Sequence, residues 1–126
     1  AVKNMEASNS LFTKLLGKAP YKSEKVESEG VNTSFFRVGE SKIELLEALN
    51  ADSPIAKFLA KKGEGVHHIA YEVDDIVAEM KRLQSEGFTL LSEVPKPGAD
   101  NKLVCFLHPK STNGVLIELC QVKPNI

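Results

Sequence analysis

Apolar and polar positions along the chain recur with two periods, and the period predicts which segments are helices. Between residues 4 and 16 the apolar side chains are spaced roughly as on a helix, with Asn4 as a favourable N-cap and Gly17 as a stop. Residues 52–65 predict a short capped helix followed by a glycine-rich linker. Residues 74–87 carry an apolar stripe and end in glycine, which predicts a third helix.

Most of the remaining segments are apolar and rich in β-branched and aromatic residues, which predicts strands, and residues 21–29 resemble a polar, exposed strand. We expect strands at residues 21–29, 31–38, 42–49, 66–73, 88–94, 102–108 and 115–122, with turns at 39–41 and 109–114 and a loop at 95–101. The first four residues look like the end of a further strand that leads into the first helix. Each half of the chain would then contain a strand, a helix and three strands.

The two halves also match each other locally. The segment AVKNM at the start of the chain aligns with EVDDI at residues 72–76, an offset of 71 residues, and KIELLEAL closes the first half as VLIELCQV closes the second. We interpret this weak duplication as two βαβββ modules, residues 1–50 and 66–122, joined by a linker helix in residues 51–65. Because neither module alone could bury both its sheet and its helix, we expect them to pair in one α+β domain over the whole chain.

Composition narrows the class of protein. The chain has 126 residues, 42% of them hydrophobic and 26% charged, with a net charge of −1, which is typical of a globular domain in water. Its lysines are scattered, so the basic surface of a nucleic-acid-binding protein is not expected. No apolar run approaches the roughly 18 residues that span a bilayer, and we find no signal peptide, so we expect no membrane partner.

Two cysteines, Cys105 and Cys120, both lie in apolar segments that resemble strands. Their spacing gives no support to a disulfide, and a CxxC metal or redox motif is absent from the sequence, so we expect small buried thiols. Reduced thiols fit a cytoplasmic location best, and that location is expected for this chain.

Two predicted strands each carry a carboxylate between apolar residues. Glu118 lies within VLIELCQV, between Ile117 and Leu119, and Glu44 lies within KIELLEAL. Side chains alternate along a strand, so the apolar neighbours would pack beneath a helix while each glutamate faces the other side of its sheet. An ionised carboxylate on a buried surface is costly unless it is paired or bound to a metal.

The strand VHHIAYEV adds a histidine to this pattern. Alternation points Ile69, Tyr71 and Val73 toward the helix and leaves His68 on the opposite face, where it could converge with the two glutamates on one cavity. Imidazole nitrogen together with carboxylate oxygen suits Zn²⁺, Co²⁺, Ni²⁺ or Mn²⁺. A single strand histidine is more often structural, and a strand glutamate is more often exposed or ion-paired. The duplicated placement favours a shared metal site.

Longer segments of the chain resemble a known family. The segments are DSPIAKFLAKKGEG at 52–65, GEGVHHIAYEVDDI at 63–76 and FLHPKSTNGVLIELCQ at 106–121. They closely resemble the methylmalonyl-CoA epimerase family of the vicinal oxygen chelate superfamily, which also contains glyoxalase I and the bleomycin-resistance proteins. The resemblance covers nearly the whole chain, and it implies two paired βαβββ modules that form a curved mixed sheet around a metal cavity.

The resemblance also implies a divalent metal ion, held by a histidine on the first strand of each module and a glutamate or glutamine on the last. Carried over, the ligands are His68, Glu44 and Glu118. Co²⁺ is the expected ion, with Zn²⁺, Ni²⁺, Mn²⁺ and Mg²⁺ as alternatives. The offset of 71 residues places the first-module histidine four positions before Ala1, so we expect the chain to be a fragment of a longer gene product.

The activity implied by the resemblance is the interconversion of (R)- and (S)-methylmalonyl-CoA. The C2 proton is removed through a metal-stabilised enolate and returned on the other face, which calls for two acid/base groups. Glu44 and Glu118 are the candidates. Several epimerases carry a non-ligand glutamate on a first-module strand, where this chain has Asn-Thr-Ser at residues 32–34. Glu47 is expected to lie on the opposite face from Glu44, as a solvated residue.

The coenzyme A portion of the substrate needs phosphate contacts. Lys110 and Ser111, in the turn of HPKSTNG, are the expected contacts, with Lys102 as a further candidate, and each could equally be an ordinary surface residue. His67 is expected to pack beside the metal ligand, and His108 to lie at a strand end near the cavity mouth. The resemblance also implies a homodimer.

Two other functions stay open. A glyoxalase I-type lactoylglutathione lyase would move a proton in a glutathione hemithioacetal on the same scaffold, and the sequence does not resolve the pocket for the thiol carrier. A metal-free small-molecule binding protein would use the fold without catalysis. The presence of His68, Glu44 and Glu118 argues against that third function, because a metal-free binder has no need of all three.

Overall fold

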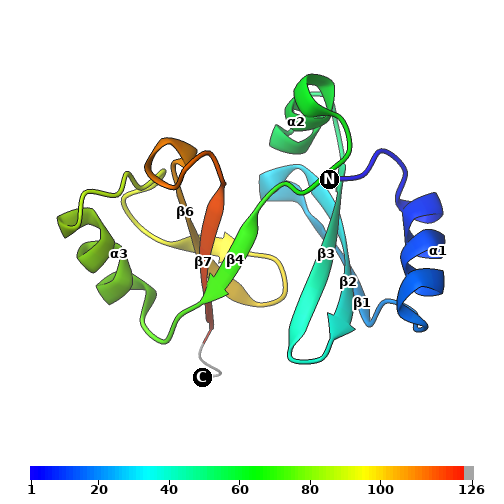
Figure 1. The fold of residues 1–126 in the computed structure, drawn as a ribbon, viewed down its shortest axis with the longest axis horizontal. Coiled ribbons are helices and arrows are strands. Elements are labelled where there is room, and N and C mark those ends of the chain that lie inside the picture. The colour runs from blue at the N-terminus through cyan, green and yellow to red at the C-terminus, as the bar shows by residue number, and fades with distance from the viewer. Residues whose placement is uncertain (124–126) are drawn as a thin grey trace. The chain divides into compact units, whose positions relative to one another are not determined.

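The computed structural model describes residues 1–123 (Figure 1). The chain divides into two compact units, residues 1–66 and the residues from 67 onward, and each is described by itself. The elements of the first unit are α1 (Met5–Leu16), β1 (Lys22–Val26), the 3-10 turn η1 (Glu27–Glu29), β2 (Val31–Val38), β3 (Ser41–Ala48) and α2 (Pro54–Lys62). Those of the second are β4 (Ile69–Glu72), α3 (Ile76–Ser85), β5 (Lys96–Gly98), β6 (Lys102–Leu107), the 3-10 turn η2 (Pro109–Ser111) and β7 (Ile117–Val122).

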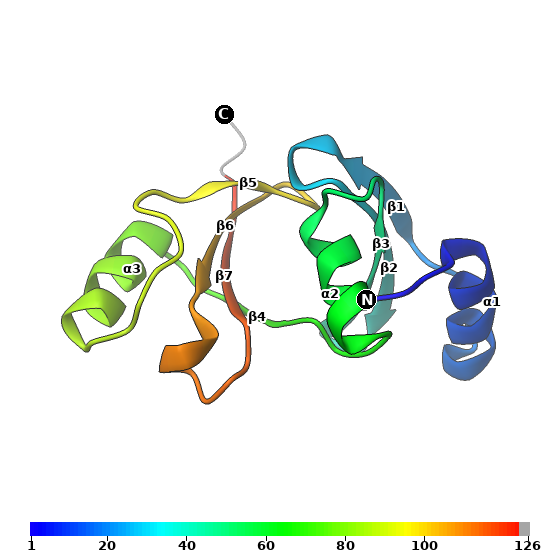
Figure 2. The ribbon, with the colours of Figure 1, turned by 90° about the horizontal axis from the view of Figure 1, so that it is seen from above.

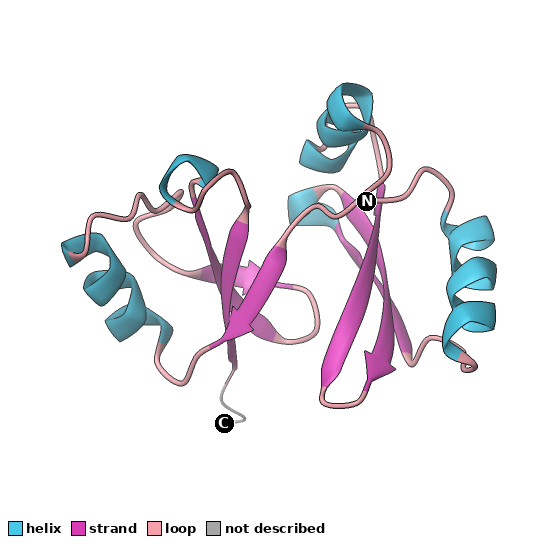
Figure 3. Ribbon diagram, viewed as in Figure 1, coloured by secondary structure: helices cyan, strands magenta, loops and turns pink. Residues whose placement is uncertain are grey.

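The first unit is an antiparallel sheet in the order β1-β2-β3, with helices packed on it (Figure 3). Ile43 and Leu45 of β3 pack against a cluster that includes α1, whereas Leu46 and Ala48 pack against a cluster that includes α2. Figure 2 shows α1 and α2 on opposite sides of this sheet, as the alternation of β3 requires. Glu44 therefore lies on the α2 side, facing away from α1, as its spacing in the sequence predicts.

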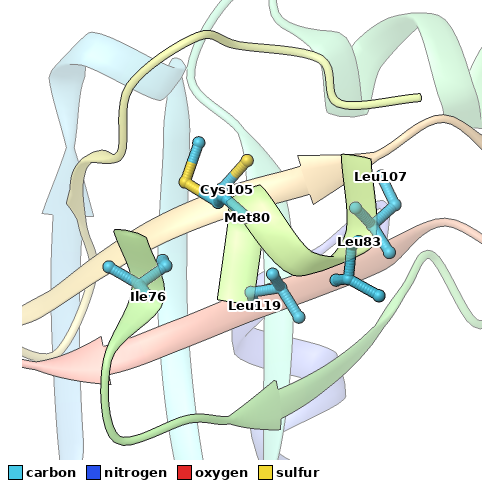
Figure 4. Packing of buried hydrophobic residues seen from close by; sticks show 6 residues of the cluster. All are labelled: Ile76, Met80, Leu83, Cys105, Leu107 and Leu119. Atoms are coloured by element: carbon cyan, nitrogen blue, oxygen red, sulfur yellow. The ribbon is translucent and has the colours of Figure 1, made fainter. Parts of the chain in front are cut away.

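The second unit is a mixed sheet in the order β4-β7-β6-β5, in which β4 runs parallel to β7 and the other pairs are antiparallel. Helix α3 packs on β6 and β7 through a buried cluster of Ile76, Met80, Leu83, Cys105, Leu107 and Leu119 (Figure 4). Ile117 and Leu119 both pack in or against this cluster, so Glu118 and its cross-strand partner Phe106 lie on the other face of the sheet.

Each unit contains an equivalent hydrogen bond near the start of its first helix. The Val2 N–H donates to the Leu46 carbonyl as the Val73 N–H donates to the Cys120 carbonyl, at 2.9 and 2.8 Å. Asn4 and Asp75, which are related by the same offset of 71 residues, are the N-caps of α1 and α3. Each caps by accepting a hydrogen bond from a main-chain N–H of the first turn.

The expected strand at residues 88–94 is wrong. Only Leu90 forms a bridge there, with Leu107, and Ser92 Oγ then donates to the Val94 carbonyl at 3.0 Å, a local contact within the same segment. The strand that does pair with this edge of β6 is β5, within the segment expected to be a loop. Phe88 and Leu90 pack against the α3 cluster from a loop. Their burial therefore does not require a continuous ladder of hydrogen bonds to β6.

Three other expected strands are shorter than the sequence suggested. β1 ends at Val26, because η1 and the left-handed Gly30 (φ 64°) turn the chain back into β2. β4 begins at Ile69 and β7 at Ile117, so His68 lies immediately before its strand.

Two side chains of β4 do not lie where alternation placed them. Ile69 and Tyr71 are 44% and 56% exposed and do not pack beneath α3, whereas Val73 packs against the cluster. The reason is topological: β4 is the edge strand of its sheet, and α3 covers β6 and β7. Sequence alternation identifies the faces of a strand but not whether a helix reaches that strand.

The expectation of free, buried thiols is confirmed in the described part of the chain. Cys105 and Cys120 are free, buried thiols. They belong to neighbouring strands but pair with Leu119 and Val104, so their side chains lie on opposite faces of the sheet. No helix among residues 1–123 is long and apolar enough to cross a membrane.

Candidate functional site

The second unit brings together His68 and Glu118, two of the three expected metal ligands. In the parallel pairing of β4 with β7, Ile69 lies beside Ile117 and Ala70 beside Glu118, so the residue before β4 reaches the start of β7. His68 Nε2 lies 3.5 Å from Glu118 Oε1, and the two side chains are 12% and 16% exposed. The polar ends of both side chains are thus largely withdrawn from water on the face opposite α3.

Two neighbouring rings hold the His68 imidazole in place. The Phe106 ring packs edge-on with it, at a centroid distance of 5.9 Å and with the ring planes 82° apart. His68 Nδ1 also lies 3.0 Å from His67 Nδ1. Burial lowers the pKa of His68 below its ordinary value, because a charged imidazolium loses hydration there. The neutral ring is therefore the favoured form, and neutral imidazole is the form that binds metals.

The first unit places Glu44 in an environment that repeats that of Glu118. Phe35 lies directly across from Glu44 in the β2–β3 ladder, as Phe106 lies across from Glu118. The Phe35 ring is fully buried, and the Lys42 ammonium lies 4.8 Å from its centroid. A glutamate with a cross-strand phenylalanine is thus the repeated feature of the two units, on the sheet face that α1 or α3 does not cover.

Glu24 is a carboxylate that reasoning from the sequence missed. It pairs with Thr33 in the β1–β2 ladder, and Thr33 in turn pairs with Leu46 of β3. Directly opposed residues share a face, so Glu24 lies on the same face as Glu44, in the adjacent row. Its side chain is 33% exposed and lies 3.3 Å from the Lys22 ammonium.

Residues 32–34 offer no carboxylate, and the neighbouring strand places Glu24 directly across from Thr33. The polar–apolar pattern of β1 alternates in burial, with Lys22, Glu24 and Val26 on the less exposed side. That alternation was the available signal. Assigning it to a face requires the hairpin register across η1, which the sequence pattern does not give.

The donors present in the second unit fit part of a metal site. Two ligand atoms bound to one ion at about 2.1 Å are separated by roughly 3.0–3.4 Å for octahedral to tetrahedral angles, close to the 3.5 Å between His68 Nε2 and Glu118 Oε1. Among the described residues no group of three His, Cys, Asp or Glu side chains is assembled for a metal. Glu44, the third expected ligand, belongs to the first unit.

The expected contacts to coenzyme A lie in and beside the turn η2. The Ser111 hydroxyl donates to the His108 carbonyl at 2.9 Å and accepts the Thr89 N–H at 3.3 Å. The Lys110 N–H donates to His108 Nδ1 at 3.0 Å, so His108 caps this turn, and the Lys110 side chain is exposed. Lys102 instead donates to Glu72 at 2.8 Å.

Glu47 is not the solvated residue that the sequence suggested. Its Oε2 accepts the Met5 N–H at 2.7 Å, and its Oε1 accepts the Asn32 side-chain amide at 3.3 Å. The carboxylate therefore stabilises the first turn of α1, where an unpaired main-chain donor would otherwise remain.

Comparisons with known proteins agree with the fold. Residues 1–106 match the family described as the Glyoxalase/Bleomycin resistance protein/Dioxygenase superfamily. The ethylmalonyl-CoA/methylmalonyl-CoA epimerase of Cereibacter sphaeroides is 44% identical over 124 residues, which cover 97% of this chain and 92% of the relative.

Solved structures give the same result. The crystal structure of methylmalonyl-CoA epimerase from Mycobacterium tuberculosis is 34% identical, with a TM-score of 0.92, and covers 98% of this chain and 83% of that one. A methylmalonyl-CoA epimerase in complex with methylmalonyl-CoA and NH4+ is 31% identical, with a TM-score of 0.91, over 95% of this chain and 88% of that one. The expected resemblance and the vicinal oxygen chelate fold are thereby confirmed, and the chain belongs to the glyoxalase/bleomycin resistance protein/dioxygenase superfamily.

Proposed function

We propose that this protein is a methylmalonyl-CoA epimerase. The observation that carries the proposal is the largely buried His68–Glu118 pair, set beside Phe106, in a chain whose other unit repeats the glutamate–phenylalanine arrangement. Relatives that match nearly the full chain are named epimerases of this substrate, and one solved relative is described with methylmalonyl-CoA bound. An acyl-CoA is therefore the proposed substrate class.

His68, Glu44 and Glu118 are the residues that would hold a divalent cation, with Co²⁺ as the first choice among Co²⁺, Zn²⁺, Ni²⁺, Mn²⁺ and Mg²⁺. The neutral imidazole and the carboxylates are a donor set that such ions accept. When bound, the cation supplies a Lewis acid that lowers the cost of negative charge on a substrate oxygen. The low exposure of His68 and Glu118 limits the access of water to these two donors.

The reaction also needs groups that move a proton at C2, which lies between a thioester and a carboxylate. Glu44 and Glu118 were the candidates from the sequence, but a carboxylate shared with a cation is a weaker base, because the cation stabilises its ionised form. Glu24 lies on the same face as Glu44 and is absent from the proposed ligand set, and its ion pair with Lys22 is partly exposed to water, so it stabilises the ionised form less than a bound divalent cation would. We therefore place Glu24 first as the group that takes the C2 proton, with Glu44 and Glu118 as the alternatives.

Lys110 and Ser111 are proposed to contact the phosphates of coenzyme A. The η2 turn exposes the Lys110 ammonium, while the capping contacts of His108 and Ser111 fix the backbone beneath it. A turn whose backbone is already fixed is suited to binding a phosphate, because little conformational entropy of the backbone is lost on binding.

The experiment is a proton-exchange assay. The protein is stripped of metal, incubated with methylmalonyl-CoA in D₂O with and without added Co²⁺, and loss of the C2 proton is followed by NMR. The hemithioacetal of methylglyoxal and glutathione is run in parallel. We expect metal-dependent exchange on the CoA ester alone, strongly reduced in Glu118→Gln and unchanged in Glu40→Gln, an exposed carboxylate at the β2–β3 turn. Turnover of the hemithioacetal without exchange on the ester would assign the protein to the glyoxalase I reaction instead.

A further inference from the structure

We propose that His67 sets the tautomer of His68, so that His68 presents an unprotonated Nε2 to a divalent cation. This inference rests on the metal site of the proposed function. It assigns a positioning role to the side chain of His67, which acts through His68. The supporting geometry is the short contact between the two Nδ1 atoms, 3.0 Å apart.

A contact of this length between two ring nitrogens is a hydrogen bond, so one nitrogen carries the proton and the other supplies the lone pair. The rings meet nearly at right angles, with planes 87° apart, so the edge of one points at the other. Two arrangements satisfy the bond. Either His67 donates and His68 accepts, or His68 donates and His67 accepts.

The two arrangements differ at the other nitrogen of His68. When His67 donates, the neutral His68 ring must carry its proton on Nε2, which lies 3.5 Å from Glu118 Oε1. That tautomer donates toward the carboxylate and has no lone pair for a metal at Nε2. When His68 donates through Nδ1, its Nε2 is a lone pair that points toward Glu118, and both atoms can bind the same ion.

The switch of His68 from the first arrangement to the second neither gains nor loses a proton overall. The Nδ1 proton of His67 passes to Nδ1 of His68, the Nε2 proton of His68 leaves to water, and Nε2 of His67 takes one proton from water. The pair stays neutral overall and releases no net proton. A carboxylate partner would hold His68 in one tautomer permanently, whereas an imidazole can act as donor or acceptor. His67 therefore lets His68 pair with Glu118 without metal and bind the metal when it arrives.

The test uses Zn²⁺ as a diamagnetic probe. Long-range ¹H–¹⁵N NMR spectra of the histidine rings, recorded on the full chain before and after Zn²⁺, distinguish protonated from unprotonated ring nitrogens. We expect His68 to carry its proton on Nε2 without metal and on Nδ1 with Zn²⁺ bound at Nε2. Zinc bound at Nδ1 of His68, or no change at His68 on adding Zn²⁺, would overturn the inference.

Two variants separate tautomer control from packing. His67→Phe keeps a ring but removes both nitrogens, and we expect Zn²⁺ affinity to fall about 10- to 100-fold. His67→Asn keeps an acceptor oxygen near the position of Nδ1 and should recover most of that affinity. His108→Asn, which also removes one imidazole, should bind Zn²⁺ as tightly as the wild type. Equal affinity of the phenylalanine variant and the wild type would contradict the role of His67.

The spectra of the wild type alone keep the inference testable if the phenylalanine variant does not fold. The inference and the proposed function also fail separately. Missing C2 exchange in the wild type would overturn the epimerase function, whereas unchanged Zn²⁺ affinity in His67→Phe would overturn the tautomer role.

Discussion

The side chain of Gln121 accepts the main-chain N–H of Ile76 at 2.7 Å, and this bond ties the end of β7 to the first residue of α3. Glu47 makes the same contact to Met5 in the first unit, also at 2.7 Å. Gln121 and Glu47 each lie three residues after a proposed ligand, Glu118 and Glu44. In both units the strand that carries the glutamate is therefore fixed to the helix on its other face.

Removing this contact should destabilise the fold. We expect Gln121→Ala to lower the free energy of unfolding by about 1–2 kcal/mol, because the Ile76 N–H at the start of α3 loses its acceptor. Gln121→Glu restores the residue type used by the first unit and should remain near wild type, because a carboxylate also interacts favourably with a helix N-terminus. Urea unfolding followed by circular dichroism measures both. Equal stability of the alanine variant and the wild type would show that the contact contributes nothing.

The buried state of His68 predicts a dependence of stability on pH. Burial lowers its pKa in the folded protein, so below the unfolded value of about 6.5 the unfolded chain binds more protons than the folded one. The stabilisation is complete above that pH and is lost as the pH falls toward the lower folded pKa. His67 and Glu118 face the same ring and are present in both proteins compared.

The measurement is the free energy of unfolding of metal-free protein at several pH values between 8 and 5, for the wild type and His68→Asn. The wild type should lose more stability than the variant between about pH 6.5 and 5, because only the wild type must protonate that ring on unfolding. A parallel pair of curves would show that His68 does not contribute. His108→Asn serves as the control for loss of an imidazole elsewhere in the same unit.

If Glu24 moves the proton and Glu118 holds the ion, substitutions at the two residues should differ in their effects on C2 exchange and on Zn²⁺ affinity. Glu24→Gln should slow C2 exchange by about 10²- to 10⁴-fold with Zn²⁺ affinity unchanged. Glu118→Gln should weaken Zn²⁺ binding and lower exchange together. Isothermal titration with Zn²⁺ and the deuterium-exchange assay make the comparison. A Glu24→Gln variant with full exchange would return the role of base to Glu44 or Glu118.

The two glutamates show what the sequence can predict. Alternation in KIELLEAL and VLIELCQV placed Glu44 and Glu118 on the faces opposite α1 and α3, and the packing of their apolar neighbours confirms this. A side chain between two core residues of a strand has one face left to it, so this prediction needs no tertiary information.

Glu24 shows what alternation along one strand cannot give. Its face depends on the pairing of β1 with β2, which is set by the 3-10 turn at residues 27–29 and the left-handed Gly30. A shift of the register by one residue would move Glu24 to the other face of the sheet. Register is a property of two segments and their turn, so the carboxylate was missed although its alternation was visible.

The predictions for residues 88–94 and for β4 were wrong for a related reason. The apolar content of residues 88–94 predicts burial, which Phe88 and Leu90 achieve against α3, but it does not state that the backbone pairs with β6. Ile69 and Tyr71 are exposed because β4 lies at a sheet edge, and edge position follows from the order of strands in space.

The most direct test of the proposed function is the stereochemical conversion itself. A single stereoisomer of methylmalonyl-CoA is incubated with metal-free protein, then with protein to which Co²⁺ has been restored, and the (R)- and (S)-forms are separated. We predict conversion to a mixture of the two forms only after the metal is added, with loss of that conversion in Glu118→Gln. A single unchanged stereoisomer in the presence of Co²⁺ would contradict the proposal that this protein is an epimerase.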